Sequence, residues 1–540
     1  MHGLSIEIKK RINMCKVNLL DCTLRDGGYI NQWKFGKDTI TGILERLSIS
    51  ELDIIECGFL TEKTKTDDYT LFSDARQVNS YIKTPNPNTL YVAMIAIGEK
   101  EINPEKLCDA SESVIGGIRL TFHMSELKKA MDWAAIIIRK GYKLFMQPVG
   151  SGYYDDSSIL ELIKKANHIK PYAFYIVDTL GAMREKDILH MMHIIDKNLD
   201  ESILLGFHSH NNLQMSFSNA QRMINFGFER DIIIDCSVYG MGRGAGNTCT
   251  ELMVDYLHKN GDNNYDVLPI LEIVDNYLIP IYLQHRWGYS VAYFLASSLQ
   301  CHPNYVSYLL EKQNMQVRSI SSLLKQIPEK KRLIYHPEII EQIYKSYQNH
   351  AIADRDEILR LRSIVKGKKI LVLGSGKSIH SKRSTIEKYI EKNHPFVIAV
   401  NFVPDIPVDM YFVANQKRYE LFKDKFSADK TVFSSNVKET PKKAVRVNYS
   451  DLLNDKEYVF DSSGMMLLRL LIRLKVRETA VAGFDGFKKN YLDNYCDKRF
   501  LHQDDSKIAR MKNMQMKELI KSMGKEIGIE FITPSKYDEK

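Results

Sequence analysis

Residues 203–238 read ILLGFHSHNNLQMSFSNAQRMINFGFERDIIIDCSV, and they contain the unit that decides the fold. Two short runs of β-branched and other apolar residues, 203–210 and 231–238, bracket a segment whose apolar residues recur three and four apart. Such runs are typical of strands that are buried on both faces. Apolar residues that recur three and four apart are typical of an amphipathic helix. The stretch therefore predicts a strand, a helix and a second, parallel strand.

The same unit recurs through the first half of the chain. Further strands are predicted at 17–21, 52–58, 90–97, 117–122, 142–149 and 173–178. Eight such strands that alternate with helices over about 250 residues indicate an α/β fold, a (β/α)8 TIM barrel. We place this barrel at residues 1–264. A doubly wound open sheet is the competing arrangement, because alternation alone does not distinguish a closed sheet from an open one.

The remaining sequence predicts further domains. Residues 265–355 have a helical pattern and are expected to extend the barrel, and 356–368 form a charged linker. KILVLGSGKSIHSK then opens a second, Rossmann-like α/β domain at 369–540, with further strands predicted at 396–401, 408–414 and 478–487. The GSGKS turn could hold a phosphate at a helix N-terminus, or it could simply connect a strand to a helix.

Composition narrows the class of protein. The chain has 540 residues, 44% of them hydrophobic and 26% charged, as expected for a globular protein of several domains. A net charge of +8 favours anionic substrates, but it does not by itself call for nucleic acid. The eight cysteines form no CxxC pair, so we expect a reducing, cytoplasmic location. We find no signal-peptide pattern, and no apolar run long enough to predict a transmembrane helix.

Polar residues follow the ends of several predicted strands. Asp26 follows the first strand, and His208 and His210 end the seventh. In a barrel these strand ends meet at one mouth, and residues i and i+2 of a strand lie on one side. A carboxylate and two imidazoles suit a divalent cation that keeps open positions, such as Mn²⁺, Mg²⁺, Co²⁺ or Zn²⁺, and Asn247 is a further candidate ligand. The alternative is that the two histidines are a core residue and a surface residue.

Two further polar residues lie at strand ends. Gln147 and Asp178 are candidates for contact with a substrate. Either side chain could equally satisfy backbone groups at the barrel mouth.

Three motifs, in order, carry a family resemblance. DCTLRDGG (21–28), GFHSHNNLQ (206–214) and YGMGRGAGNTCTE (239–251) resemble the DRE-TIM metallolyases. WGYSVAYFLASSLQCHPNYVSYLL (287–310) favours the 4-hydroxy-2-oxovalerate aldolase branch, and the likeness covers roughly residues 15–345. The resemblance implies a divalent metal, Mn²⁺ by first preference, that is bound by Asp26, His208 and His210.

The resemblance also implies roles for residues beside the metal. Arg25 would stabilise an enolate oxygen, and Glu56 would pair with Arg25 and hold it in place. This sequence departs from the aldolase branch at one position, where Tyr29 replaces the histidine that serves as base. Tyrosine has an ordinary pKa near 10, so Tyr29 is either a weak acid–base group or a packing aromatic. Tyr289 is a second candidate for the acid–base step.

A second resemblance concerns the C-terminal domain. DSSGMMLLRLLIRLKVRETAVAGFDGF (461–487), taken with GSGKSI and FITPSKY (531–537), resembles the Rossmann-like domains of the MptE-like (DUF115) group and of GT42-type bacterial sialyltransferases. It implies a nucleotide or nucleotide-sugar pocket. The residues expected to line it are Gly374, Ser375, Gly376, Ser378, Asn401, Ser463 and Gly464. Asp485 and His502 are candidate bases there.

The leading functional hypothesis is a metal-dependent aldolase that joins or separates a pyruvate-type 2-oxo acid and an aldehyde. Surface polysaccharide biosynthesis is the expected setting. Two alternatives remain open: a Claisen-type synthase that uses an acyl-CoA and a 2-oxo acid, and a glycosyl or nucleotidyl transferase whose barrel is a scaffold. We also expect a homodimer formed through the helical extension.

Overall fold

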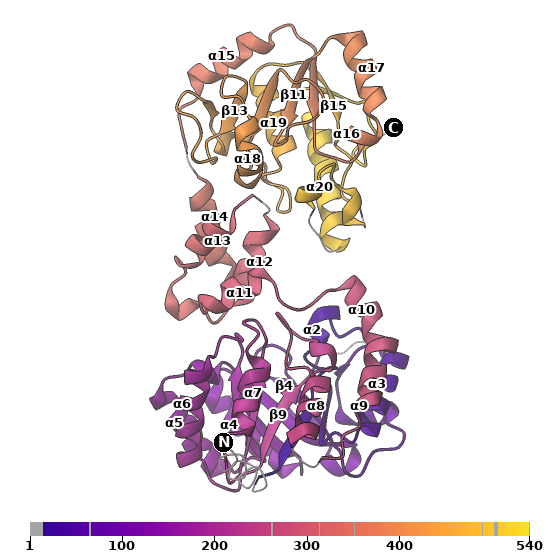
Figure 1. The fold of residues 1–540 in the computed structure, drawn as a ribbon, viewed down its shortest axis with the longest axis vertical. Helices are drawn as coiled ribbons and strands as arrows, with labels where there is room; N and C mark the ends of the chain where they lie inside the picture. The colour runs from indigo at the N-terminus through magenta and orange to yellow at the C-terminus, as the bar shows by residue number, and fades with distance from the viewer. Residues whose placement is uncertain are drawn as a thin grey trace. The chain divides into compact units, whose positions relative to one another are not determined.

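The computed structural model describes residues 15–63, 66–260, 263–312, 314–349, 351–488, 490–501 and 506–538, so the candidate base His502 lies outside the described residues. Its contacts divide the chain into two compact units (Figure 1). The first unit comprises Met1–Ser307 and Pro328–Tyr335, and the second comprises Tyr308–Ile327 and His336–Lys540.

The first unit is a closed parallel barrel. Its strands are β1 (Val17–Asp21), β2 (Ile54–Leu60), β4 (Leu90–Ala96), β5 (Ile115–Phe122), β6 (Lys143–Pro148), β7 (Ala173–Asp178), β8 (Leu204–Ser209) and β9 (Ile232–Cys236). The short strand β3 (Leu71–Phe72) pairs beside β2. The sheet closes where β1 pairs with β2, with Leu20 opposite Ile54. The predicted barrel is therefore confirmed, and the open doubly wound sheet is excluded for this unit.

Helices surround most of the barrel (Figure 1). They are α3 (Lys37–Ile49), α4 (Leu127–Arg139), α5 (Asp156–Ile169), α6 (Glu185–Asn198), α7 (Ser216–Ile224) and α8 (Thr250–Asn260). The connection from β2 to β4 contains the 3₁₀ segment Ala75–Ser80, and the connection from β4 to β5 contains Pro104–Lys106 and Ala110–Glu112. These two connections, residues 61–89 and 97–114, contain no α-helix among their described residues, but both are longer than the dozen or so residues that a parallel crossover needs.

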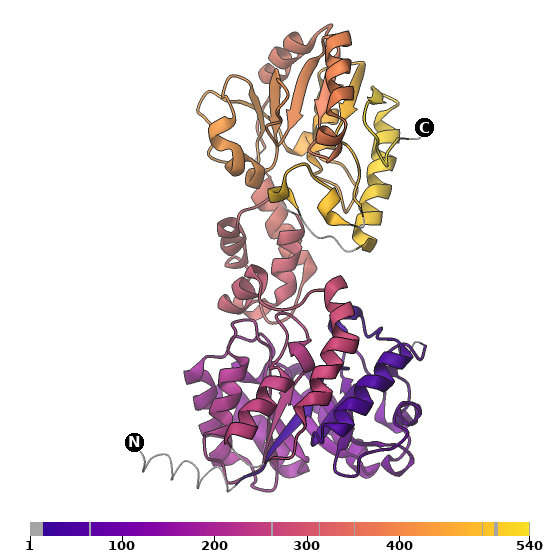
Figure 2. The same ribbon diagram turned by 45° about the vertical axis from the view of Figure 1, so that its right-hand side comes forward.

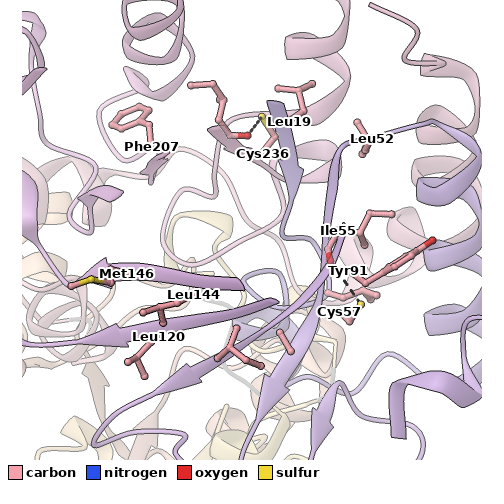
Figure 3. Close-up of a cluster of buried hydrophobic side chains, with 14 of the residues drawn as sticks. Leu19, Leu52, Ile55, Cys57, Tyr91, Leu120, Leu144, Met146, Phe207 and Cys236 are labelled. Atoms are coloured by element: carbon pink, nitrogen blue, oxygen red, sulfur yellow. Dashed lines mark hydrogen bonds between the residues drawn. The ribbon is translucent and has the colours of Figure 1, made fainter. Parts of the chain in front are cut away.

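Alternation along the strands produces two apolar layers. Leu19, Ile55 and Phe207 pack in the layer that also contains helix residues, and Figure 3 shows part of this cluster. Their strand neighbours Leu20 and Ile54 belong to a separate interior cluster. Because both faces of each strand are covered, the strands read as continuous apolar runs in the sequence.

The barrel is followed by a long apolar helical stretch. It runs through α9 (Val267–Ile273), a π-helical segment (Val274–Leu278) and α10 (Ile279–Gln284). Among the residues that the structure describes, Val267–Gln284 alone is long and apolar enough, with a mean hydropathy of 1.2, to cross a membrane by length and composition. These two criteria are weak evidence for a span, since the stretch also packs Ile270, Ile273 and Leu278 into the barrel core.

The helices after α10 are shared between the units. Helix α11 (Val291–Ser298) belongs to the first unit, whereas α13 (Val317–Leu324) and α14 (Pro337–Gln348) belong to the second. Helix α12 (Pro303–Glu311) spans the change from one unit to the other. Polar contacts tie the later helices to the second unit: Asn314 Nδ2 and Tyr344 Oη each donate to Asp461 Oδ2 at 2.8 Å.

The second unit contains an open, seven-stranded parallel sheet. Its order is β14-β13-β12-β11-β10-β15-β16. The strands are β10 (Ile370–Leu373), β11 (Phe396–Val400), β12 (Met410–Val413), β13 (Thr431–Ser434), β14 (Val445–Val447), β15 (Glu478–Ala482) and β16 (Gly528–Phe531). This confirms a second α/β domain. The strand order reverses between β10 and β15, which is the switch point where open α/β sheets bind ligands.

Helices cover both faces of this sheet (Figure 2). The core of one face contains residues of α15 (Arg355–Val365), α19 (Ser463–Arg473) and α20 (Ser506–Met523). The core of the other contains residues of α16 (Ser378–Ser381), α17 (Arg383–Asn393) and α18 (Gln416–Phe422). Most of the stretch expected as a linker is thus helix α15, which buries Ile358, Leu361 and Val365.

Candidate metal and enolate site

Three candidate metal ligands meet at the mouth of the barrel. Asp26 follows β1, His208 lies on β8 and His210 follows β8. One ligand atom from each lies within 4.8 Å of the other two, and all three side chains are buried. Ser209 faces elsewhere and donates to Asp178 Oδ2 at 3.1 Å. The alternation of strand β8 therefore brings both imidazoles to one place, as the HxH spacing predicts.

The polar atoms at this cluster fit a cation. His210 Nδ1 and Asn247 Oδ1 are buried without a hydrogen-bond partner among the described residues. Asn247 Nδ2 donates to Asp26 Oδ2 at 2.8 Å, so its amide oxygen is turned away from the carboxylate. Unsatisfied buried acceptors are costly, and a divalent ion bound beside Asp26 would satisfy His210 Nδ1, which lies 3.8 Å from Asp26 Oδ2. The donor set of one carboxylate and two imidazoles fits such an ion, whereas metal binding by Asn247 stays a prediction.

The charge states also suit metal binding. Burial alone would raise the pKa of Asp26, but Arg25 and the two histidines lower it below its usual range. Burial lowers the pKa of His210 to about 4. The site therefore offers an ionised carboxylate and a neutral imidazole at neutral pH, which are the forms that coordinate a metal.

His208 is oriented by a carboxylate beneath it. Its Nδ1 lies 2.9 Å from Asp235 Oδ2, which leaves Nε2 for the metal. Asp235 is itself held by Tyr175, whose Oη donates to Oδ1 at 3.1 Å, and by an ion pair with Arg119. A carboxylate that accepts Nδ1–H fixes the tautomer and the ring orientation of a metal-binding histidine.

Arg25 is fixed by two carboxylates and keeps one free nitrogen. Its Nε donates to Glu56 Oε2 at 2.8 Å, and its Nη1 donates to Asp26 Oδ1 at 2.6 Å. Glu56 Oε2 also accepts from Arg119 Nη1 at 2.5 Å. Arg25 Nη2 is buried and has no partner among the described residues. A pre-positioned guanidinium with one unused donor is suited to an oxygen that gains negative charge during a reaction.

Removing the support of His208 is expected to weaken metal binding. For Asp235→Ala we expect about 10–100-fold weaker Mn²⁺ affinity, because the imidazole loses the group that orients it. Asp235→Asn retains an oxygen acceptor and should recover part of the loss. Isothermal titration calorimetry on the full chain measures this, with Asp231→Ala, at the other end of β9, as the matched control. Affinity within about three-fold of the wild type in Asp235→Ala would contradict the assignment.

The two tyrosine candidates differ in their surroundings. Burial and Glu99 raise the pKa of Tyr29, so it remains a phenol at neutral pH. Its Oη donates to Glu99 Oε1 at 3.2 Å. Tyr29 is thus a hydrogen-bond donor in its resting state. Tyr289 lies in the loop between α10 and α11, where its side chain is 60% exposed.

Gln147 and Asp178 are both buried at the strand ends. With its amide oxygen turned toward Arg119, Gln147 accepts from Nε at 2.9 Å. Asp178 Oδ1 accepts from Ala182 N at 3.0 Å and from the hydroxyl of Tyr153. Gln147 thus contacts a side chain, and Asp178 satisfies a backbone N–H as well as Tyr153. Contact of either residue with a substrate stays a prediction.

The sequence analysis did not single out Arg119 and Asp235, which support His208 and Arg25 at this site. Arg119 and Asp235 are charged residues within otherwise apolar strands, GIRLTF and DIIIDC, and both are buried. A charge in such a run is the available signal, because a buried charge needs a partner. The identity of the partner could not be read, since the two residues come from strands that lie far apart in the sequence.

In the second unit, the GSGKS turn is packed against the loop after β15. A Cβ on Gly374 would lie 2.7 Å from Gly483 O, and one on Gly376 would lie 2.5 Å from the same atom. Asp485 Oδ2 accepts from the backbone N of Ser378 at 2.8 Å, so this carboxylate occupies the start of α16. These glycines allow close chain packing, and the phosphate-binding role of this turn stays a prediction.

The other predicted pocket residues lie near the same strand ends. Ser375 O accepts from Cys496 N at 3.0 Å, and Asn401 Oδ1 accepts from Ala414 N at 2.8 Å. Ser463 and Gly464 begin α19, where a Cβ on Gly464 would lie 2.7 Å from the Phe484 ring. Ligand binding by these residues, like the nucleotide or nucleotide sugar itself, stays a prediction.

Residues 16–276 match the HMGL-like family model. This match lies within the first unit and agrees with the expected resemblance to the DRE-TIM metallolyases. The match ends before the second unit begins, so it does not identify the family of the C-terminal domain.

Curated relatives cover about half of the chain. The 4-hydroxy-2-oxovalerate aldolase of Geobacillus genomosp. 3 is 25% identical over 276 residues, which are 49% of this chain and 77% of that protein. The oxaloacetate decarboxylase of Mycobacterium tuberculosis is 25% identical over 251 residues, 45% of this chain and 70% of that protein. Among solved structures, the HMG-CoA lyase of Brucella melitensis has 16% identity and a TM-score of 0.41, and it covers 48% of this chain and 96% of that one. The curated relatives support a lyase-type enzyme.

Proposed function

We propose that the first unit is a divalent-metal-dependent aldolase that makes or cleaves the carbon–carbon bond between a pyruvate-type enolate and an aldehyde. The substrate in the cleavage direction is a 4-hydroxy-2-oxo acid. The observation that carries this proposal is the buried cluster of Asp26, His208 and His210 beside Arg25, whose Nη2 is unpaired among the described residues. Relatives named as a 4-hydroxy-2-oxovalerate aldolase and an oxaloacetate decarboxylase support it.

A divalent cation, with Mn²⁺ as our first choice and Mg²⁺, Co²⁺ or Zn²⁺ as alternatives, would be held by Asp26, His208 and His210 and would supply Lewis acidity toward a 2-oxo acid. Arg25 donates to the 2-oxo oxygen as that oxygen gains charge, and Glu56 prevents the guanidinium from turning away. In cleavage, the bond between C3 and C4 breaks, its electrons form the enolate, and the 4-hydroxyl proton passes to solvent water as the aldehyde carbonyl forms. A proton from solvent then adds to C3 and gives pyruvate.

The experiment is deuterium exchange into pyruvate, followed by mass spectrometry in D₂O with and without Mn²⁺. Exchange at C3 requires only enolate formation, so it needs no knowledge of the aldehyde. We expect metal-dependent exchange by the wild type and by His190→Ala, a control that removes an exposed histidine on α6. His210→Ala should lose the exchange. A wild-type protein that binds Mn²⁺ and yet exchanges no faster than buffer would refute the proposed function.

A further inference from the structure

The backbone of Arg243 lies beside the metal cluster. Its backbone N donates to Asp26 Oδ2 at 3.1 Å, so the side chain starts one hydrogen bond away from a candidate ligand. The guanidinium lies over the ring of Tyr29, with Cζ 5.3 Å from the ring centroid. Arg243 therefore belongs to the mouth of the barrel, on the Tyr29 side of the metal cluster.

The charge of Arg243 is not balanced by an ion pair. Across the described ranges, no carboxylate lies within salt-bridge distance of its guanidinium, and the nearby Glu99 is paired with Lys100. Its protein partners are instead an aromatic ring and the imidazole of His302, which its Nη2 contacts. Arginine is charged at neutral pH, so without a carboxylate partner its positive charge is available to an anionic ligand.

His302 holds the side chain of Arg243 in place. Arg243 Nη2 forms a hydrogen bond with His302 Nε2. Burial, together with Arg243, lowers the pKa of His302 to about 3, so the neutral ring can accept this bond at Nε2. His302 is thus a positioning residue, and the other N–H groups of the guanidinium are left to donate to an oxyanion.

We propose that Arg243, positioned by His302, binds an anionic group at the far end of the substrate, so that the aldehyde partner carries a carboxylate or a phosphate monoester. This inference rests on the proposed function. The metal cluster and Arg25 take the 2-oxo acid end, and Arg243 extends from that cluster to the outer end of the same ligand. Acetaldehyde, which has no charge, would leave the guanidinium of Arg243 without an anionic partner.

The first test compares matched aldehydes in condensation with pyruvate and Mn²⁺. Succinic semialdehyde is compared with butanal, and glyceraldehyde 3-phosphate with glyceraldehyde, so the two pairs distinguish a carboxylate from a phosphate. In the pair whose charged member carries the anionic group that the site binds, we expect kcat/KM to favour the charged aldehyde by about 30-fold, which corresponds to about 2 kcal/mol. Equal use of the charged and neutral members of both pairs would overturn the inference.

Substitutions of Arg243 test whether this residue causes the preference for an anionic aldehyde. Arg243→Met should reduce the preference about 30-fold, mainly through KM, because the lost contact is made in both the ground state and the transition state. Arg243→Lys should recover part of it. Arg139→Met is the matched control, since this arginine is exposed at the C-terminal end of α4, away from the mouth. An anionic preference that survives unchanged in Arg243→Met would also overturn the inference.

A binding measurement separates this inference from the proposed function. 2-Oxoheptanedioate and 2-oxoheptanoate differ only in the terminal carboxylate, and their affinities for the Mn²⁺-loaded full chain can be measured by calorimetry. For a carboxylate site we expect tighter binding of the diacid and loss of the difference in Arg243→Met. If the protein exchanges pyruvate but neither assay shows a preference for the anionic compound, the anion site is refuted and the proposed aldolase is not. An Arg243-dependent preference for the diacid without any exchange would refute the aldolase and leave the anion site standing.

Discussion

Arg25→Met is expected to lower kcat by about 10²–10³-fold with stoichiometric metal still bound, because the variant removes a donor aimed at developing charge. The structure gives the reason. Two of the three nitrogens of the guanidinium are used by Glu56 and Asp26, and the third, Nη2, is buried and unpaired among the described residues. Arg25→Lys should not restore the rate, since lysine cannot reproduce the planar fork.

Steady-state kinetics with pyruvate and the aldehyde that the wild type uses best, combined with metal analysis of the purified variant, measures this effect. Arg222→Met is the control, because this arginine forms an exposed ion pair with Glu185. The expected pattern is a fall in kcat with normal metal content in Arg25→Met and near wild-type kinetics in the control. A kcat within about three-fold of the wild type would contradict the role of Arg25.

Arg119→Met is expected to reduce the free energy of unfolding of the first unit by about 3–5 kcal/mol, because breaking a buried ion pair leaves an uncompensated charge. Arg119 forms ion pairs with Glu56 and Asp235, and all three side chains are fully buried. Methionine fills a similar volume but leaves two buried carboxylates without their shared cation.

Urea unfolding followed by tryptophan fluorescence measures this change selectively. The chain has three tryptophans, Trp33, Trp133 and Trp287, and all of them belong to the first unit. Arg139→Met serves as the control, and it should shift the free energy of unfolding by less than about 1 kcal/mol, as exposed ion pairs do. A loss below about 1 kcal/mol in Arg119→Met would show that the buried network contributes little to stability.

The barrel and its metal cluster could be predicted because they depend on local patterns. Apolar runs mark the strands, and the spacing of His208 and His210 places both on one side of β8. The ends of parallel barrel strands always meet, so Asp26 could be brought to the same mouth from far away in the sequence. These inferences need no knowledge of side-chain packing.

The rest depends on contacts that the sequence does not display. Nothing local pairs Arg119 with Asp235, or brings His302 from the segment after α11 to Arg243. In the second unit, β13, β14 and β16 were not predicted. They are three or four residues long, and β14 and β16 are partly exposed, so they lack a long apolar run. The close approach of Gly483 to the GSGKS turn is likewise a tertiary contact.

The central claim is that Asp26, His208 and His210 hold one divalent cation. Electron spin echo envelope modulation of the full chain loaded with Mn²⁺ tests it directly, since the ¹⁴N signal reports imidazole nitrogens bound to the ion. We predict one tightly bound Mn²⁺ with ¹⁴N modulation from two imidazoles, reduced in His208→Ala and in His210→Ala and unchanged in the control His190→Ala. The account is contradicted if Mn²⁺ is not taken up, or if the nitrogen signal is the same in all four proteins.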